Sequence, residues 1–291
     1  MSEVDLAEFR AEMEAEREWR EREMRQLRNQ LSLLSSDDHR KTARKALVVM
    51  LYAHFEGVSK ALLSMYVNRI NNLGLRVDEV VPHIGAASLA EIFRALRDPN
   101  RKCAEFARQL PNDTALHRFA RDREFVEVAW KVAQRSVQID AEDVVDTESN
   151  LKPVVLKKIL FRLGLDPALA QPWEGAMHLL LNRRNAVAHG TAKAGLEEKE
   201  YAKLEQAVSL VVDGIVKAIF HAVACKVYLA ATRQVSVGGA AGIPPISWTH
   251  LLRSALGLER LQLPLGGGLV TEGGVQARAV VEALDVREEG A

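Results

Sequence analysis

Cysteine is scarce in this sequence: 291 residues contain only Cys103 and Cys225. Two cysteines are too few for a disulfide framework. No Cys-x-x-Cys or His-x-x-x-His spacing occurs, so we expect no structural zinc site. Stability must therefore come from an ordinary apolar core.

The sequence also lacks net charge, because 39 Lys and Arg residues balance 39 Asp and Glu residues. A zero balance excludes a protein that coats nucleic acid broadly through positive charge, although it does not exclude a local binding site. Apolar residues make up 48%, which excludes disorder of the whole chain. The sum also hides unlike regions, since residues 1–25 hold 9 acids and 5 bases, a local charge of 5 − 9 = −4.

An N-terminal apolar stretch is missing, so the sequence predicts no signal peptide. The most apolar window, residues 207–231, contains Asp213, Lys217, His221 and Lys226. Charged side chains are costly at the centre of a bilayer. We interpret this window as a buried helix of a cytoplasmic protein and expect no association with a membrane.

Glycine is rare before residue 236, with 8 glycines in residues 1–235 and 10 in residues 236–291. The change predicts a helical domain over 1–235 and a Gly-rich linker with a C-terminal extension over 236–291. Within the domain we expect a charged helix over 1–34 and a core over 37–232.

Apolar periodicity predicts that the domain is all-α. Residues 125–130 alternate in the manner of a strand, but no second strand signal lies nearby to pair with them, which favours a helix. Pro153 and Pro172 suit the starts of helices, and Gly190 suits a helix end. The expected long helices cover residues 3–34, 37–71, 153–163, 173–189 and 197–232.

One segment is basic throughout, because no acid lies between Leu151 and Leu165. Arginine and lysine neutralise phosphates, so this segment is a candidate RNA-binding surface. The candidate RNA-binding residues are Lys157, Lys158 and Arg162.

Residues 182–190 carry the side chains best suited to chemistry. At 100° per residue, Asn182, Asn185 and His189 share a helical face about 60° wide, and Arg183 and Arg184 flank it. Histidine exchanges protons near neutral pH, and arginine offers a fork of donors that matches phosphate oxygens. This combination suits metal-independent cleavage of RNA, where the 2′-OH is the nucleophile. The alternative interpretation is structural, in which His189 caps or packs the helix end before Gly190.

The sequence Arg-Asn-Ala-Val-Ala-His at residues 184–189 resembles the Arg-Asn-x-x-x-His motif of the HEPN superfamily. A second segment, residues 44–57, resembles the early core helix of bacterial stand-alone HEPN nucleases, an apolar helix interrupted by an acidic residue, here Glu56. The two segments lie about 130 residues apart, in the order expected for that family. The resemblance covers residues 37–232.

The resemblance implies an all-α, HEPN-like helical bundle that forms a homodimer with a composite active site and needs no cofactor and no metal. Arg184 would bind the scissile phosphate, His189 would transfer protons, and Asn185 would orient His189 or the substrate. Glu56 would be a polar partner in the core, bonded to Arg184 or His189. Arg183 and Asn182 would support the site, and Arg183 has a second acceptable spacing to His189.

The function implied is that of an endoribonuclease acting as a toxin, phage-defence or stress effector, with an antitoxin or defence-system protein as partner. A Tyr that is modified in certain toxin members is replaced here by Thr191, so that form of control is not expected. The alternative is a non-catalytic HEPN module that binds a nucleotide or regulates a partner protein.

Overall fold

The computed structural model describes residues 3–230, and the expected extension at 236–291 lies outside the described residues. Within the described range the chain is all-α, as predicted, with two isolated β-bridges and no strand. The helices are α1 (Glu3–Ser32), α2 (Asp37–Asn71), α3 (Pro82–Ser88), α4 (Ala90–Arg97), α5 (Thr114–Val132), α6 (Ala141–Val144), α7 (Pro153–Arg162), α8 (Glu174–Ala188) and α9 (Glu198–Ala224), with short 3-10 helices at Val77–Glu79 and Pro167–Trp173.

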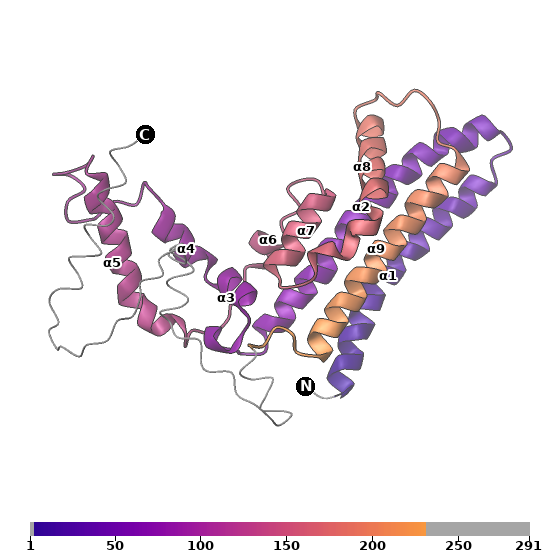
Figure 1. Cartoon of the computed structure of the whole chain (residues 1–291). Coiled ribbons are helices and arrows are strands. Elements are labelled where there is room, and N and C mark those ends of the chain that lie inside the picture. Colours follow the sequence, from indigo (N-terminus) through magenta and orange to yellow (C-terminus); the bar gives the residue numbers. More distant parts are fainter. Residues whose placement is uncertain (1–2, 231–291) are drawn as a thin grey trace, which may run out of the picture. The chain divides into compact units, whose positions relative to one another are not determined.

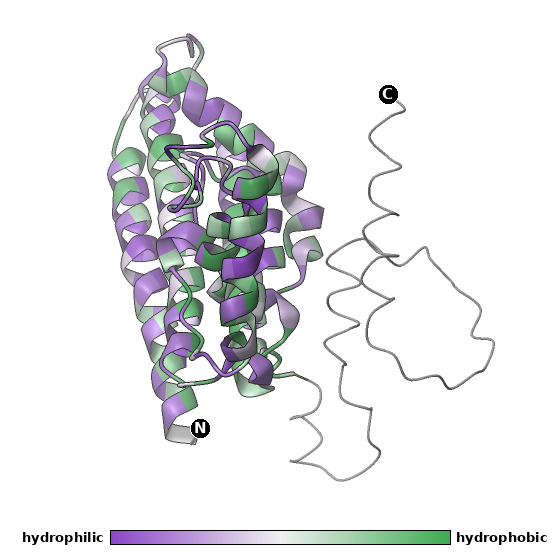
Figure 2. Cartoon of the chain, turned by 90° about the vertical axis from the view of Figure 1, so that its left-hand side faces the viewer, coloured by the Kyte–Doolittle hydropathy of each residue, from purple (hydrophilic) through white to green (hydrophobic). Residues whose placement is uncertain are grey.

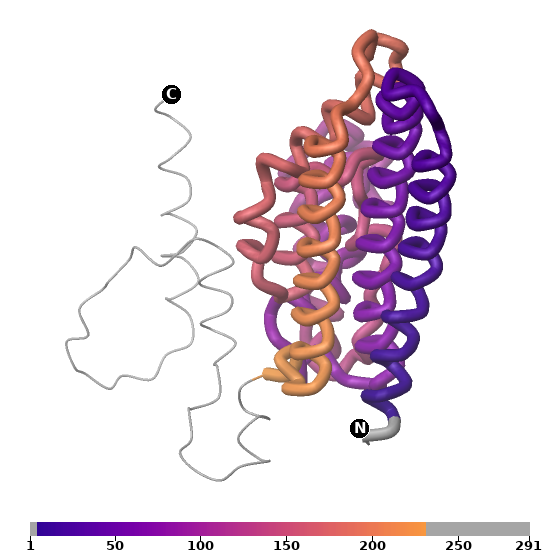
Figure 3. Tube along the Cα trace, turned by 90° about the vertical axis from the view of Figure 1, so that its right-hand side faces the viewer, coloured from indigo at the N-terminus to yellow at the C-terminus, as the bar shows by residue number. Residues whose placement is uncertain are grey.

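The core of the bundle forms around α2, which packs against α1, α8 and α9 (Figure 1). Figure 3 shows α1, α2 and α9 running side by side along their length. Helix α2 contributes thirteen buried residues, so little of its circumference is left for polar side chains. Figure 2 shows hydrophilic and hydrophobic residues interleaved along the helices on the visible face, as expected for helices that bury one side.

Two helices, α2 and α9, are long and apolar enough to cross a membrane by length and composition. Such helices also form the centres of globular bundles, and both pack here against other helices of the described chain. Asp213 of α9 forms an ion pair with Arg17 of α1, with 2.5 Å between Arg17 Nη1 and Asp213 Oδ1. Asp213, a charged residue within the apolar window, is therefore paired with a residue of another helix of the bundle.

The last helix ends earlier than predicted, at Ala224 rather than near residue 232. Lys226 adopts a left-handed conformation with φ 53°, and its N–H bonds to Val223 O while Val227 N–H bonds to Ala222 O. This pair of hydrogen bonds is the Schellman arrangement, which satisfies the last carbonyls of a helix. Glycine or asparagine usually occupies the left-handed position, so a lysine there gave no sequence signal.

The start of α8 differs slightly from expectation, whereas α5 agrees with it. Pro172 does not begin α8, because residues 167–173 form a 3-10 helix and α8 starts at Glu174. The alternating segment at 125–130 lies inside α5, as favoured. Asp113 caps α5 by accepting a hydrogen bond from Leu116 N–H over 2.9 Å.

We predict that the bundle loses stability as the pH rises from about 10 to 12. Burial raises the pKa of Tyr52 to about 12, and burial also raises the pKa values of Tyr66, Tyr201 and Tyr228 above 10. A tyrosine whose pKa is higher in the folded than in the unfolded state contributes stability to the fold. This contribution is fully present below the unfolded-state pKa and is lost as the pH rises through the folded-state pKa. Urea unfolding at pH 7, 9 and 11 measures this, and a Tyr66→Phe variant should show a smaller loss. An equal loss in wild type and variant would contradict the assignment to Tyr66.

Candidate functional site

The candidate motif lies on the C-terminal half of α8, which is fixed to the bundle by Met177, Leu180 and Leu181. All three are buried, and α8 packs on α2 and α9. Arg184 and Asn185 are half-buried on this helix, whereas Asn182, Arg183 and His189 are exposed. The motif residues thus sit on a rigid helix but differ in their access to solvent.

Three segments of the chain hold the guanidinium of Arg184. Its Nη1 donates hydrogen bonds to Asn150 Oδ1 over 3.0 Å and to Asn185 Oδ1 over 2.9 Å. Its Cζ lies 4.5 Å from the centre of the Tyr52 ring, within the range of a cation–π contact. Neither Nε nor Nη2 of Arg184 has a hydrogen-bond or ion-pair partner among residues 3–230. One edge of the guanidinium is therefore anchored, and the other keeps its donors for a ligand.

Tyr52 is itself held from both sides. Its hydroxyl oxygen accepts a hydrogen bond from Leu151 N–H over 2.7 Å. Burial, the charge of Glu56 and hydrogen bonding to that carboxylate together raise the pKa of Tyr52 to about 12, so the phenol stays protonated at neutral pH. A neutral ring with a fixed orientation is a suitable platform for a cation.

Glu56 reaches the candidate site through Tyr52. The sequence suggested that it would bond to Arg184 or His189, but no such contact occurs among the described residues. Tyr52 and Glu56 lie one helical turn apart on α2, and the negative charge of Glu56 helps to raise the pKa of the Tyr52 hydroxyl. The acidic residue in the apolar helix thus affects the candidate site through the pKa of Tyr52.

The turn before Asn150 is strained. Glu148 and Ser149 both have positive φ angles, 52° and 63°. Residues other than glycine and asparagine rarely adopt this backbone conformation. Such a conformation costs on the order of 1–3 kcal/mol per residue and clusters at functional sites. The same turn supplies both Asn150 Oδ1 to Arg184 and Leu151 N–H to Tyr52. The strained turn therefore fixes the arginine and its platform together.

The structure distinguishes the two arginines. Arg183 Nε donates to Glu200 Oε1 of α9 over 2.7 Å, and its side chain is exposed. Arg184 instead faces α2 and the 148–151 turn. Both arginines have an acceptable spacing to His189. Arg184 is the one whose guanidinium is held in place by other residues of the bundle.

His189 is the C-cap of α8 and is exposed. Gly190 follows with φ 70°, and hydrogen bonds from Gly190 N–H to Val187 O and from Thr191 N–H to Ala186 O end the helix, as the sequence predicted. The His189 side chain has no hydrogen-bond or ion-pair partner within the described part of the chain. Asn185 was expected to orient His189 or the substrate, but its Oδ1 accepts from Arg184.

Arg184 and His189 do not converge within one chain. Five residues of helix separate them by about 7.5 Å along the axis and by about 140° around it. Neither side chain contacts the other in the described structure. One chain therefore presents the Arg184 guanidinium and the His189 imidazole at separate positions and does not bring them together at one point.

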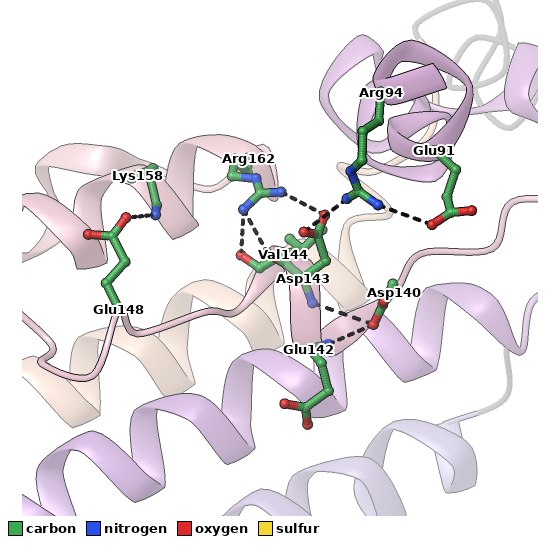
Figure 4. A network of polar contacts seen from close by, with 9 residues as sticks. All are labelled: Glu91, Arg94, Asp140, Glu142, Asp143, Val144, Glu148, Lys158 and Arg162. Carbon is green, nitrogen blue, oxygen red and sulfur yellow. Dashed lines mark hydrogen bonds and ion pairs between the residues drawn. The ribbon is translucent and has the colours of Figure 1, made fainter. Parts of the chain in front are cut away.

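The predicted basic surface is largely neutralised by acids distant in sequence. Lys157 pairs with Glu174, Lys158 with Glu148, and Arg162 Nη2 lies 3.2 Å from Asp143 Oδ2. Figure 4 shows the last two pairs, with Asp143 also bound by Arg94. An RNA-binding role for these three residues stays a prediction, and the structure reduces the free positive charge that they offer.

The described residues contain no group of three or more His, Cys, Asp or Glu side chains placed to hold a metal ion. Sequence reasoning missed two residues of the site, Tyr52 and Asn150. Tyr52 lay inside the segment that suggested the early core helix, one turn before Glu56, so its position offered a signal. Asn150 ends an acidic segment and carried none.

The comparisons with known proteins place this architecture in a family. The sequence profile described as HEPN_MAE_28990-like HEPN matches residues 9–228, about three quarters of the chain. No curated protein and no solved structure matches the chain. The matched range spans the helices from α1 to α9, and HEPN domains are all-α, in agreement with the fold. The HEPN superfamily contains many ribonucleases as well as nucleotide-binding modules. The chain therefore belongs to the HEPN superfamily.

Proposed function

We propose that this protein is a metal-independent endoribonuclease in which Arg184 binds the scissile phosphate and His189 transfers protons. The observation that carries the proposal is the anchoring of Arg184: two asparagine oxygens and the Tyr52 ring hold one edge, while Nε and Nη2 remain for an anion. A guanidinium fixed before the substrate arrives stabilises developing charge without reorganisation.

The proposed reaction needs only proton transfers and charge stabilisation. A neutral imidazole takes the proton of the 2′-OH, and O2′ attacks phosphorus while the bond from phosphorus to O5′ breaks. A protonated imidazole donates a proton to the leaving O5′. The products are a 2′,3′-cyclic phosphate and a 5′-OH, and the two Arg184 donors stabilise the charge on the phosphate oxygens in between.

Two imidazoles are needed at one phosphate, and the arrangement on α8 supplies one per chain. We propose that a homodimer brings two copies of the helix end together at a two-fold axis, so that the site is composite. His189 is exposed and has no partner in the described chain, which leaves it available to meet a second copy. Analytical ultracentrifugation at micromolar concentration measures the oligomeric state. A protein that is monomeric at this concentration and still cleaves RNA would contradict this arrangement.

The biological setting is a separate proposal, motivated by the resemblance to stand-alone HEPN nucleases. We propose a cytoplasmic toxin, phage-defence or stress effector, held in check by an antitoxin or another defence-system protein. The second candidate function is a non-catalytic module, favoured by the same observation: the anchored guanidinium can hold a nucleotide phosphate without chemistry. Binding of RNA with no cleavage product would favour the module over the nuclease.

Removing the anchor of Arg184 is expected to lower cleavage without unfolding the protein. The Asn150→Ala substitution removes one of the two hydrogen bonds to Nη1, so the guanidinium samples other positions, and we expect a decrease in kcat of about tenfold. Single-turnover cleavage of an RNA oligonucleotide measures the effect.

Asn182→Ala is the matched control, because Asn182 is exposed and has no hydrogen-bond or ion-pair partner in the described structure. It should leave kcat within about twofold of wild type. If Asn150→Ala and Asn182→Ala behave alike, Asn150 does not position Arg184 for the reaction.

A further inference from the structure

A depression lies between α1 and α9, with α2 as its base, and Arg184 does not line it. Its cavity volume is about 280 Å³, slightly below the usual range of small-molecule sites, about 300–1,000 Å³. We call it the arginine slot. Its apolar floor is built from Met24 of α1, Leu51, Phe55 and Val58 of α2, and Val208 and Val212 of α9.

Ion pairs between α1 and α9 bound the arginine slot at both ends. Arg17 Nη1 lies 2.5 Å from Asp213 Oδ1, and Arg28 Nη1 lies 2.7 Å from Glu205 Oε2. On α9 the two acids are eight residues apart, which corresponds to about 12 Å of helix. The opening is therefore long enough for a fused-ring or short-chain molecule and too short for a polymer to lie within it.

The rim of the arginine slot carries two further arginines, both from α1. Arg20 is bound to Glu16 and lies 4.2 Å over the ring of Trp19. Arg25 also lines the slot and has no hydrogen-bond or ion-pair partner among residues 3–230. A guanidinium without a carboxylate at the edge of an apolar floor recognises an anion attached to an apolar body.

The arginine slot and the candidate active site use different faces of the same turns of α2. Leu51 and Phe55 line the slot, whereas the ring of Tyr52, one residue after Leu51, lies against Arg184. Successive residues point about 100° apart around a helix. The slot is thus a separate site, and no residue that holds Arg184 lines it.

We propose that the arginine slot binds a small organic anion, a molecule with an apolar ring body and one sulfonate, phosphate or carboxylate group. The ring body covers the floor between the two ion pairs, and the acidic group binds Arg25 at the rim. This inference is independent of the ribonuclease activity, because it concerns neither Arg184 nor His189.

Two fluorescent dyes with the same ring skeleton test the proposal on the full chain: anilinonaphthalene sulfonate, which carries an anionic group, and phenylnaphthylamine, which carries none. Titration should show that the sulfonate binds on the order of tenfold more tightly, the worth of a charge-assisted hydrogen bond. Arg25→Gln should remove this difference, whereas Arg22→Gln, on the exposed side of α1 and paired with Glu18, should keep it. Equal binding of both dyes to the wild type would overturn the proposal.

Filling the arginine slot tests the location. Val208→Trp places a large side chain on the floor and should abolish the binding of both dyes. If this variant is unstable, Ser209→Trp is used in its place, because Ser209 lines the slot at an exposed position and should have the same effect. The control is Trp130→Ser, which removes an exposed apolar side chain of α5, 82% exposed and outside the slot. Dye binding that survives both filling variants, or that is lost in Trp130→Ser, would show that the slot is not the binding site.

Discussion

Replacing Arg184 with glutamine is expected to reduce RNA cleavage about 100- to 1,000-fold, the usual cost of losing one preorganised donor at a developing oxyanion. Glutamine is uncharged and cannot present the two donors, Nε and Nη2, that the anchored guanidinium keeps for phosphate oxygens. The decrease should fall on kcat as well as on kcat/KM, because the interaction is strongest in the transition state. Steady-state kinetics with a labelled oligonucleotide measures both kcat and kcat/KM.

Arg183→Gln is the matched control for this experiment. It changes the neighbouring arginine in the same way and removes the same charge, but Arg183 is exposed and bound to Glu200. We expect cleavage within about threefold of wild type, since an exposed ion pair contributes little. Equal losses in Arg183→Gln and Arg184→Gln would contradict the assignment of the phosphate-binding role to Arg184.

Loss of folding must be separated from loss of chemistry. Arg184 is half-buried, and its removal leaves Asn150 Oδ1 and Asn185 Oδ1 without this donor. Thermal unfolding should therefore show a modest decrease in stability. Arg184→Lys keeps the positive charge but cannot bond to two asparagines and a phosphate in one plane, so it should restore stability more than activity.

Replacing His189 with alanine is expected to lower cleavage by a factor of about 10² to 10⁴, the range supplied by general acid–base catalysis. Its position at the exposed end of α8 predicts that stability changes little, because the side chain is exposed and has no hydrogen-bond or ion-pair partner in the described chain. A wild-type profile of kcat/KM against pH should be bell-shaped, as expected where one imidazole accepts and another donates a proton.

His178→Ala is the control for the histidine experiment. His178 lies on the same helix, is exposed and has no hydrogen-bond or ion-pair partner in the described structure, so its loss should not change the rate. Retention of full activity by His189→Ala would exclude His189 as the proton carrier.

The helices themselves could be predicted from local patterns. The dense apolar residues of α2, Pro153 at the start of α7 and Gly190 after α8 each signal structure within a few residues of where it occurs. The end of α9 could not be predicted, because Lys226 adopts the left-handed conformation usually taken by glycine. Local signals predict elements well where the residue types match their usual positions.

The contacts of the candidate site depend on the fold rather than on local pattern. Arg184 and the surrounding motif were visible in the sequence, but Asn150 lies 34 residues away and Tyr52 lies on another helix. For the same reason the basic segment after Leu151 seemed free of acids, although Glu174 and Glu148 neutralise two of its lysines. Composition within a segment does not show which charges the fold brings against it.

Cleavage of RNA by the purified protein in EDTA tests the central claim most directly. Wild type, Arg184→Gln and His189→Ala are compared at equal concentration, and the ends of the product are identified by mass spectrometry. We predict that only the wild type cleaves efficiently, and that it leaves a 2′,3′-cyclic phosphate and a 5′-OH without added metal. Equal cleavage by all three proteins, or cleavage that requires a divalent metal, would contradict the account.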